Sequence, residues 1–133
     1  LLYIDWIVLK RLWDTSEMPS RGRTITWFPH VEIAGRRHPH LVLQWSDITG
    51  ESGWVSREEF LNFQCAKMST SAYLYDVFEK EGQRFVRLFA SFEREEESFG
   101  DRNCLPWHVL TTASQDLVEI ALIFQRGNVP PLP

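Results

Sequence analysis

The alternation of apolar and polar residues along the chain predicts a protein built mainly from β-strands. Five segments are predicted to be strands, and alternation supports the first and the last of them: residues 23–33, 41–45, 54–55, 83–92 and 105–111. Pro29 places the first of them at a sheet edge or beside a bulge, because proline cannot donate to a strand ladder.

The segments between these strands differ in composition. Residues 46–53 are rich in Gly, Ser and Asp, and we expect them to form a hairpin loop between the second and third strands. Residues 35–39 are predicted to be a polar connection, and residues 93–103 a long polar loop before the last strand.

Helical segments are predicted before and between the strands. Asp5 is suited to cap a short helix over residues 6–13, which a loop at 14–22 follows. Residues 56–59 read Ser-Arg-Glu-Glu, a Ser-x-x-Glu capping box that should start a helical turn. Residues 69–80 fit either a helix or a strand, and we favour a helix.

A closing helix is predicted at the end of the chain. Residues 112–115 form a second capping box, after which apolar residues continue to Gln125. Gly127 follows as the C-cap. The many apolar residues of this helix require that much of its surface packs.

The order of these elements predicts the architecture. Five strands with a helical link between the third and fourth are the plan of the OB-fold, a small Greek-key barrel. We therefore expect a mainly β protein with flanking helices, in the form of a five-stranded OB-fold-like barrel over a single domain, residues 1–133. In that barrel the second and third strands form a hairpin, and the first strand also pairs with the fourth.

Composition and charge narrow the function. The chain is 44% hydrophobic with six Trp and nine Phe, so it can form a core and has aromatic anchors to offer a partner. Its net charge of −4 argues against non-specific binding to a phosphate backbone, so we expect weak or no direct nucleic acid binding. No apolar run is long enough to span a membrane. The two cysteines, Cys65 and Cys104, are expected to be free thiols, as in the cytosol or nucleus.

No signature of catalysis is found in the sequence. Phosphate-binding glycine loops and the His-Glu-x-x-His zinc motif are missing, so we expect no enzyme activity and no cofactor. Three histidines, His30, His38 and His40, could in principle hold a metal, but no cysteine or acid lies nearby at ligand spacing. We interpret them as exposed loop residues and expect no metal site.

Two groups of charged residues are candidate surfaces. Residues 93–97, Glu-Arg-Glu-Glu-Glu, are either a solvated loop or a docking site for a basic partner. A second candidate is a face for single-stranded nucleic acid, combining four arginines with two tryptophans: Arg21, Arg23, Arg36, Arg37, Trp27 and Trp45. The alternative is that both tryptophans belong to the core.

Two stretches of the chain resemble a known family. One is residues 1–7, Leu-Leu-Tyr-Ile-Asp-Trp-Ile, and the other is residues 41–63, from Leu-Val-Leu-Gln-Trp to Phe-Leu-Asn-Phe. They resemble the telomerase-associated OB-fold family, which includes the yeast telomerase accessory subunit and the animal shelterin adaptor that recruits telomerase. The residues that carry the resemblance are Trp6, Ile7, Asp47 and Trp54.

The chain also departs from that family. The family usually has Pro before the tryptophan of the first stretch, where this chain has Asp5. The animal protein follows its third strand with an acidic patch, whereas residues 64–72 contain no acid here.

A second resemblance is to chromodomains and chromo shadow domains. Residues 41–45, 54–60 and 73–80 have the order of aromatic strand end, tryptophan and final helix. The third aromatic residue of a methyl-lysine cage is missing after Trp45, and the two ends of the chain are left without a role.

The telomerase resemblance implies a non-catalytic, nuclear protein-docking subunit of a telomerase or telomere complex. Its partners would be telomerase catalytic or accessory subunits. A chromo-like peptide-binding module and a single-stranded nucleic-acid-binding OB-fold are the alternatives. We predict that charged side chains near the capping box and beyond it contact the partner: Arg57, Glu58, Glu59, Asp76, Glu79 and Lys80. Trp6 is expected to be buried between the first helix and the barrel.

Overall fold

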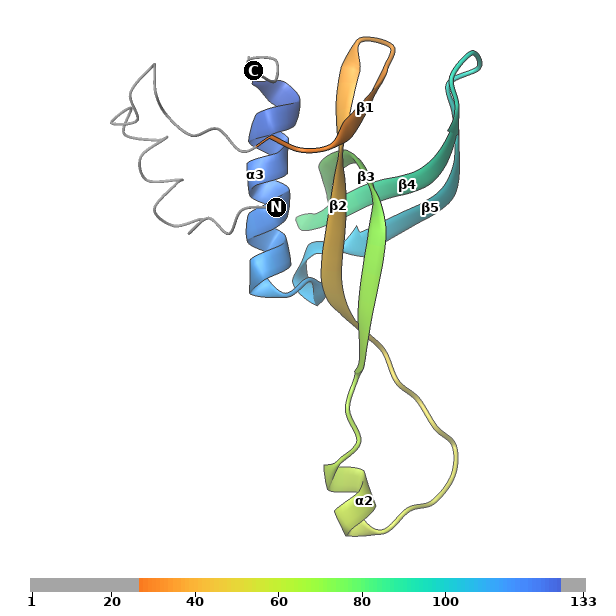
Figure 1. Ribbon diagram of the computed structural model, residues 1–133. Helices are drawn as coiled ribbons and strands as arrows, with labels where there is room; N and C mark the ends of the chain where they lie inside the picture. The colour runs from red at the N-terminus through yellow and green to blue at the C-terminus, as the bar shows by residue number, and fades with distance from the viewer. Residues whose placement is uncertain (1–26, 128–133) are drawn as a thin grey trace, which may run out of the picture.

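The computed structural model describes residues 27–127, and within them the chain forms one antiparallel sheet and a C-terminal helix (Figure 1). The strands are β1 (His30–Ile33), β2 (Arg36–Asp47), β3 (Ala66–Lys80), β4 (Gln83–Glu93) and β5 (Ser98–Pro106). The helices are α2 (Arg57–Leu61), the 3-10 turn η1 (Trp107–Val109) and α3 (Thr112–Arg126). The predicted β-rich class with a C-terminal helix is confirmed.

Each strand pairs with its neighbours in sequence, so the sheet is a meander with the order β1-β2-β3-β4-β5. The predicted pairing of residues 23–33 with residues 83–92 is therefore wrong for the described part of the chain. Residues 83–92 lie between β3 and β5 instead. Short turns connect β1 to β2 and β3 to β4, and tight turns favour pairing between neighbours over a Greek-key crossover.

Two tight turns fix this meander. Ala34 and Gly35 have φ angles of 54° and 77°, and Glu81 and Gly82 repeat the same two values. Consecutive positive φ angles are those of the two-residue turn whose twist matches antiparallel strands. Residues 69–80 belong to β3, which pairs with β2 and β4, so the helix predicted there is wrong.

Four other sequence predictions are corrected. Residues 54–55 are not a strand, and the loop after β2 is longer than 46–53, because it runs from residue 48 to residue 65. Residues 93–103 are not a long loop, because β4 and β5 meet through a short turn at residues 94–97. The predicted strand at 105–111 ends at Pro106 and continues as η1.

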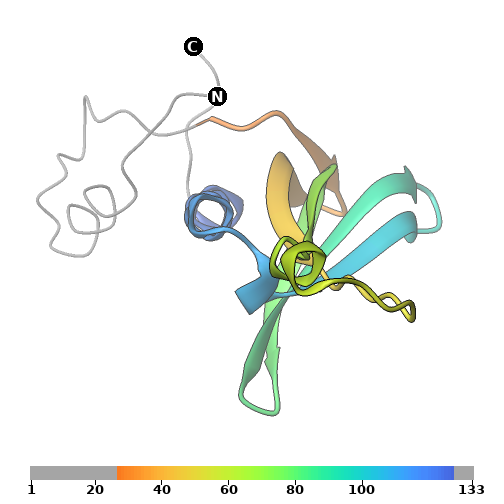
Figure 2. The same cartoon turned by 90° about the horizontal axis from the view of Figure 1, so that it is seen from below.

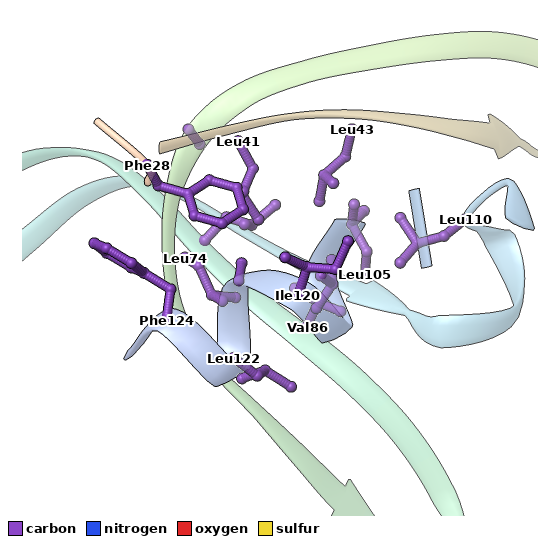
Figure 3. Close-up of a cluster of buried hydrophobic side chains, with 14 residues drawn as sticks. Phe28, Leu41, Leu43, Leu74, Val86, Leu105, Leu110, Ile120, Leu122 and Phe124 are labelled. Atoms are coloured by element: carbon purple, nitrogen blue, oxygen red, sulfur yellow. The ribbon is translucent and has the colours of Figure 1, made fainter. Parts of the chain in front are cut away.

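The core lies between the sheet and α3 (Figure 3). In β2, Leu41 and Leu43 are buried while Val42 and Gln44 are exposed, as the period of two requires. Leu74, Val86 and Leu105 come from the other strands, and α3 contributes an apolar face to the same cluster: Val118, Ile120, Ala121, Leu122 and Phe124. The predicted packing of the closing helix is confirmed.

Polar contacts hold α3 on the edge of β2. Its N-cap is Thr111, one residue earlier than predicted, and the backbone N–H of Thr111 donates to the carbonyl of Gln44 (3.0 Å). The N–H of Gln44 in turn donates to the Ser114 hydroxyl (2.7 Å). Beside them, a single β-bridge joins Trp45 to Leu110. The segment after β5 thus returns to β2, and the sheet curls around beside α3 (Figure 2).

Candidate functional site

A long arm projects from the sheet between β2 and β3. We call residues 48–65 the arm; it contains α2 and lies well away from α3 (Figure 1). Its large apolar side chains are exposed: Trp54 completely, Ile48 to 90%, Phe60 to 66% and Leu61 to 69%. Isolated exposed apolar residues are ordinary, but several on one segment make it a candidate interaction surface.

The short helix α2 in the arm is fixed by local chemistry. The Ser56 hydroxyl accepts a hydrogen bond from the N–H of Glu59 (3.2 Å), which confirms the predicted capping role of Ser56. Asn62 closes the helix, and its side-chain amide donates to the carbonyl of Glu58 (3.3 Å). The helix therefore forms although none of its residues is buried.

The structure separates the six charged residues that were predicted to act together. Arg57, Glu58 and Glu59 are exposed on α2. Asp76, Glu79 and Lys80 lie toward the far end of β3, roughly 35–50 Å along the strand from the arm at the rise of an extended chain. On a strand, Asp76 and Glu79 point to opposite faces, so the single polar face predicted for a helix is also wrong.

The four residues that carry the family resemblance have different positions. Trp6 and Ile7 lie outside the described residues, as does the predicted first helix. The Asp47 carboxylate accepts a hydrogen bond from the N–H of Ile48 (2.8 Å), at the point where the arm leaves β2. Trp54 is at the fully exposed part of the arm.

A second site lies at a bulge in β3. Leu74 pairs with Leu88 and Asp76 pairs with Arg87, so Tyr75 is an extra residue without a partner in β4. Bulges release backbone groups from the ladder and redirect a side chain. Here the Tyr75 carbonyl accepts hydrogen bonds from Arg36 (3.0 Å) and from the Gln125 side chain of α3 (3.0 Å). These contacts hold the bulge in place.

The Tyr75 ring lies within a group of aromatic and cationic side chains. Its centroid is 5.2 Å from the ring of Phe99 and 5.5 Å from that of His38, which stacks on it. The guanidinium groups of Arg36 and Arg87 lie 5.1 Å and 5.7 Å from the same centroid. This combination of rings and guanidinium groups is suited to planar or anionic ligands.

Three of these side chains, Tyr75, Phe99 and Arg87, line a hollow of about 450 Å³. Its lining comes from β3, β4 and β5: Tyr75, Arg87, Leu88, Phe89, Phe99, Arg102, Asn103 and Cys104. Arg87 and Phe89 alternate with Val86 and Leu88, whose side chains belong to the core, so the hollow opens on the face of the sheet opposite α3. Sequence reasoning missed the hollow, because it assigned residues 69–80 to a helix and residues 93–103 to a loop.

The arginines around the hollow differ in whether they already have a hydrogen-bond or ion-pair partner. Arg87 donates two hydrogen bonds to the carboxylate of Asp76 (2.7 and 2.5 Å), and this contact raises the pKa of Arg87. Arg36 is held by the Tyr75 carbonyl. The exposed Arg102 has no hydrogen bond or ion pair within residues 27–127, and no acidic residue of this range lines the hollow. The hollow therefore presents an available guanidinium beside aromatic rings.

The three histidines considered as metal ligands each have a separate partner. His38 is buried rather than exposed, and its Nδ1 donates to the carbonyl of Leu74 (3.0 Å). Burial lowers the pKa of His38 below its ordinary value, against the opposing effect of the Leu74 hydrogen bond. His30 contacts the carbonyl of Phe28, and His40 contacts the Ser71 hydroxyl. No group of three metal-ligating side chains forms within the described residues.

The predicted face of tryptophans and arginines does not form from the members that are described. Trp27 and Trp45 are half-buried and pack against the core, and the Trp45 indole donates to Thr70 (2.9 Å). Arg37 lies over the ring of Phe124 and reaches the carbonyl of that residue, at the end of α3. Both cysteines are free and exposed: Cys65 is in the arm and Cys104 lines the hollow.

Comparison with protein families, with curated proteins and with solved structures found no significant match to this chain. Among the described residues, no helix combines the length and apolar character needed to cross a membrane.

Proposed function

We propose that this protein is a non-catalytic docking module that inserts its arm into an apolar groove of a partner protein. The observation that supports the proposal is the group of exposed Ile48, Trp54, Phe60 and Leu61 on an arm with its own capped helix. Large aromatic and aliphatic side chains that leave water on binding are the usual anchors of protein interfaces.

The energy available from the arm is sufficient for a specific interface. Complete burial of a Phe- or Leu-sized side chain contributes about 1.5–3 kcal/mol, so a few such anchors can offset the cost of association. The turn at α2 is already formed, which reduces the ordering that binding requires. Glu58 and Glu59 flank the apolar group, so the partner groove should have a basic rim.

We propose a telomerase or telomere complex as the setting, with a telomerase catalytic or accessory subunit as the partner and the nucleus as the compartment. The support is the sequence resemblance of residues 41–63, a stretch that covers half of β2 and most of the arm. An OB-fold-like barrel stays part of this proposal. In its favour is the bridge between Trp45 and Leu110, which brings the end of the sheet back toward β2.

A chromo-like peptide-binding module is a second candidate. The observation that favours it is the meander of neighbouring strands with a C-terminal helix packed on β2. A methyl-lysine peptide would require an aromatic cage that attracts a cation. The aromatic hollow instead has the guanidinium groups of Arg87 and Arg102 in its lining, and these repel a cation.

Binding of the purified chain to the purified telomerase catalytic subunit of the same source tests the proposal. We expect binding by the natural chain, and a loss of at least tenfold in affinity for the variant Trp54→Ala with Phe60→Ala. Val42→Ala is the matched control, because Val42 is an exposed apolar residue on β2 outside the arm. It should bind as the natural chain does.

Other outcomes would overturn parts of the proposal. If no telomerase subunit binds, the telomerase setting is wrong. If the chain dimerises at micromolar concentration and the arm variant is monomeric, the occupant of the arm surface is a second copy. If removal of residues 1–26 increases the labelling rate of Cys65 several-fold, the arm is covered by its own chain. Tight binding of a trimethyl-lysine peptide, weakened by Tyr75→Ala, would favour the chromo-like candidate.

A further inference from the structure

We infer that the hollow behind the β3 bulge binds one nucleotide unit, with its base against the rings of Tyr75 and Phe99 and its phosphate on Arg102. This site is separate from the arm, because its residues lie on β3, β4 and β5 on the face of the sheet opposite α3. Its test therefore does not depend on the docking proposal.

The size of the hollow agrees with a ligand of this class. Its volume of about 450 Å³ lies within the range of small-molecule sites, roughly 300–1,000 Å³. Tyr75 and Phe99 are half-buried and their rings meet edge to face at 5.2 Å. Because His38 stacks on one side of Tyr75, the base has the exposed remainder of this aromatic corner to pack on. Any of the nucleotide bases can pack on such an aromatic surface, because each base has a planar π-face.

The charge of the site selects an anion. Arg87 and Arg102 both line the hollow. Arg36 is not part of the lining, but its guanidinium group lies over the Tyr75 ring. Asp76 engages Arg87, whereas Arg102 has no partner within residues 27–127. A guanidinium group binds phosphate through two parallel hydrogen bonds, so Arg102 is placed to take the phosphate of a ligand whose base lies on the rings.

The geometry around the bulge shows that the site is a stable feature of the fold. The Tyr75 carbonyl is held by Arg36 and Gln125, and the Leu74 carbonyl by His38. These side chains come from β2 and α3, which are distant in sequence. The orientation of the Tyr75 ring is thus set before any ligand arrives, which reduces the entropy lost on binding.

The expected affinity is modest. One available arginine and two rings provide a single-nucleotide site, and the net charge of −4 gives no general attraction for a polyanion. Free nucleotides and a nucleotide within a single strand present the same chemistry to this site, and the experiment distinguishes these two sources.

Cys104 provides the measurement, because its exposed thiol lines the hollow. In a Cys65→Ser background it is the sole thiol of the chain, and its rate of reaction with N-ethylmaleimide reports access to the site. The probes are thymidine monophosphate, thymidine, inorganic phosphate and an octathymidylate strand. We expect the monophosphate to slow labelling saturably, and thymidine or phosphate alone to need at least a tenfold higher concentration.

Two variants assign the effect to Arg102. Arg102→Ala should raise the protecting concentration about tenfold, as expected for loss of a charge-assisted contact. Arg126→Ala removes the same charge from the exposed end of α3 and should leave protection unchanged. Unfolding curves of both variants verify that the fold is retained.

The probes also decide between sources of the nucleotide. The protecting concentration of octathymidylate is counted per nucleotide unit and compared with that of thymidine monophosphate. If octathymidylate protects at a tenfold lower concentration, the natural ligand is a single strand. If the two concentrations are equal, the natural ligand is a free nucleotide. Equal protection by inorganic phosphate, or by thymidine, overturns the inference, because the site then takes an anion or a base alone. Failure of every probe to protect at millimolar concentration overturns it completely.

Discussion

Helices α2 and α3 begin with the same kind of N-cap but differ in how much of their surface is buried. Each has a hydroxyl N-cap, Ser56 or Thr111, that accepts from the N–H three residues later at 3.2 Å. Yet α3 buries six residues, whereas α2 buries none. Local capping chemistry therefore forms a helical turn in both places, but burial depends on whether a sheet lies opposite the apolar face.

This difference separates the parts of the molecule that carry stability from those available for binding. Apolar side chains of α3 contribute to the free energy of unfolding because folding removes them from water. Those of the arm remain in water in the described structure, so they add no burial energy to folding; under the docking proposal, a partner removes them from water. The two helices thus allow the same residue type to be tested in both settings.

The largest expected loss in the free energy of unfolding comes from truncating a phenylalanine of the core. Phe124→Ala should lower the free energy of unfolding by about 3–5 kcal/mol, because Phe124 is buried between Phe28 and Trp27. Phe60→Ala in the arm should change it by about 0.5 kcal/mol or less, as is usual at exposed positions. Urea unfolding followed by fluorescence measures both. Equal losses in the two variants would show that the arm is buried in solution.

A smaller effect is expected at the ends of the two helices. A Cβ atom on Gly127 would lie 2.7 Å from the carbonyl oxygen of Ile123, so Gly127→Ala must displace backbone at the end of α3. We expect a loss of about 1–3 kcal/mol, the usual cost of forced overpacking. Asn62→Ala at the exposed end of α2 should cost about 0.5 kcal/mol or less. Thermal unfolding is the measurement, and an unchanged Tm for Gly127→Ala would contradict the tight end of α3.

The third prediction concerns pH and the bulge that α3 holds in place. Burial lowers the pKa of His38 in the folded state below its unfolded value of about 6.5. At pH values between the folded and the unfolded pKa, the unfolded chain therefore binds more protons than the folded chain. Stability should be fully present above pH 6.5 and should fall as the pH drops through it. Urea midpoints between pH 5 and 8 test this.

His38→Gln is the matched variant, because it removes the titrating group while retaining a side-chain donor near the Leu74 carbonyl. Its midpoint should depend less on pH between 5 and 7 than that of the natural chain. His108→Gln, on the exposed surface of η1, should keep the natural profile. An identical slope in the natural chain and His38→Gln would show that another group controls it.

The smallest effect on stability is expected from the charged residues. Glu58→Lys combined with Glu79→Lys should change the free energy of unfolding by about 0.5 kcal/mol or less, because both are exposed. If the partner groove has a basic rim, Glu58→Lys alone should weaken binding, whereas Glu79→Lys should not, since it lies far from the arm along β3. Equal weakening by both single variants would support the joint surface predicted from the sequence.

Several features followed from the sequence because their causes are local. The Ser56 cap, the apolar face of α3 and its end at Gly127 depend on neighbours within a few residues. The apolar residues of segment 41–45 likewise indicated a strand, and burial alternates along it with a period of two. For the same reason, the β-rich class with a C-terminal helix could be predicted.

Other features were decided by contacts between distant residues. Residues 69–80 have mixed local preferences, and they became a strand because β2 pairs with β3 up to Tyr73 and β4 pairs with it from Tyr73 onward. The exposure of Trp54 depends on the absence of a described element opposite the arm, which no local pattern encodes. The hollow depends on a bulge at Tyr75 held by Arg36 and Gln125, residues 39 and 50 positions away. Pairing and burial are properties of the assembled chain, so only the tertiary structure fixed them.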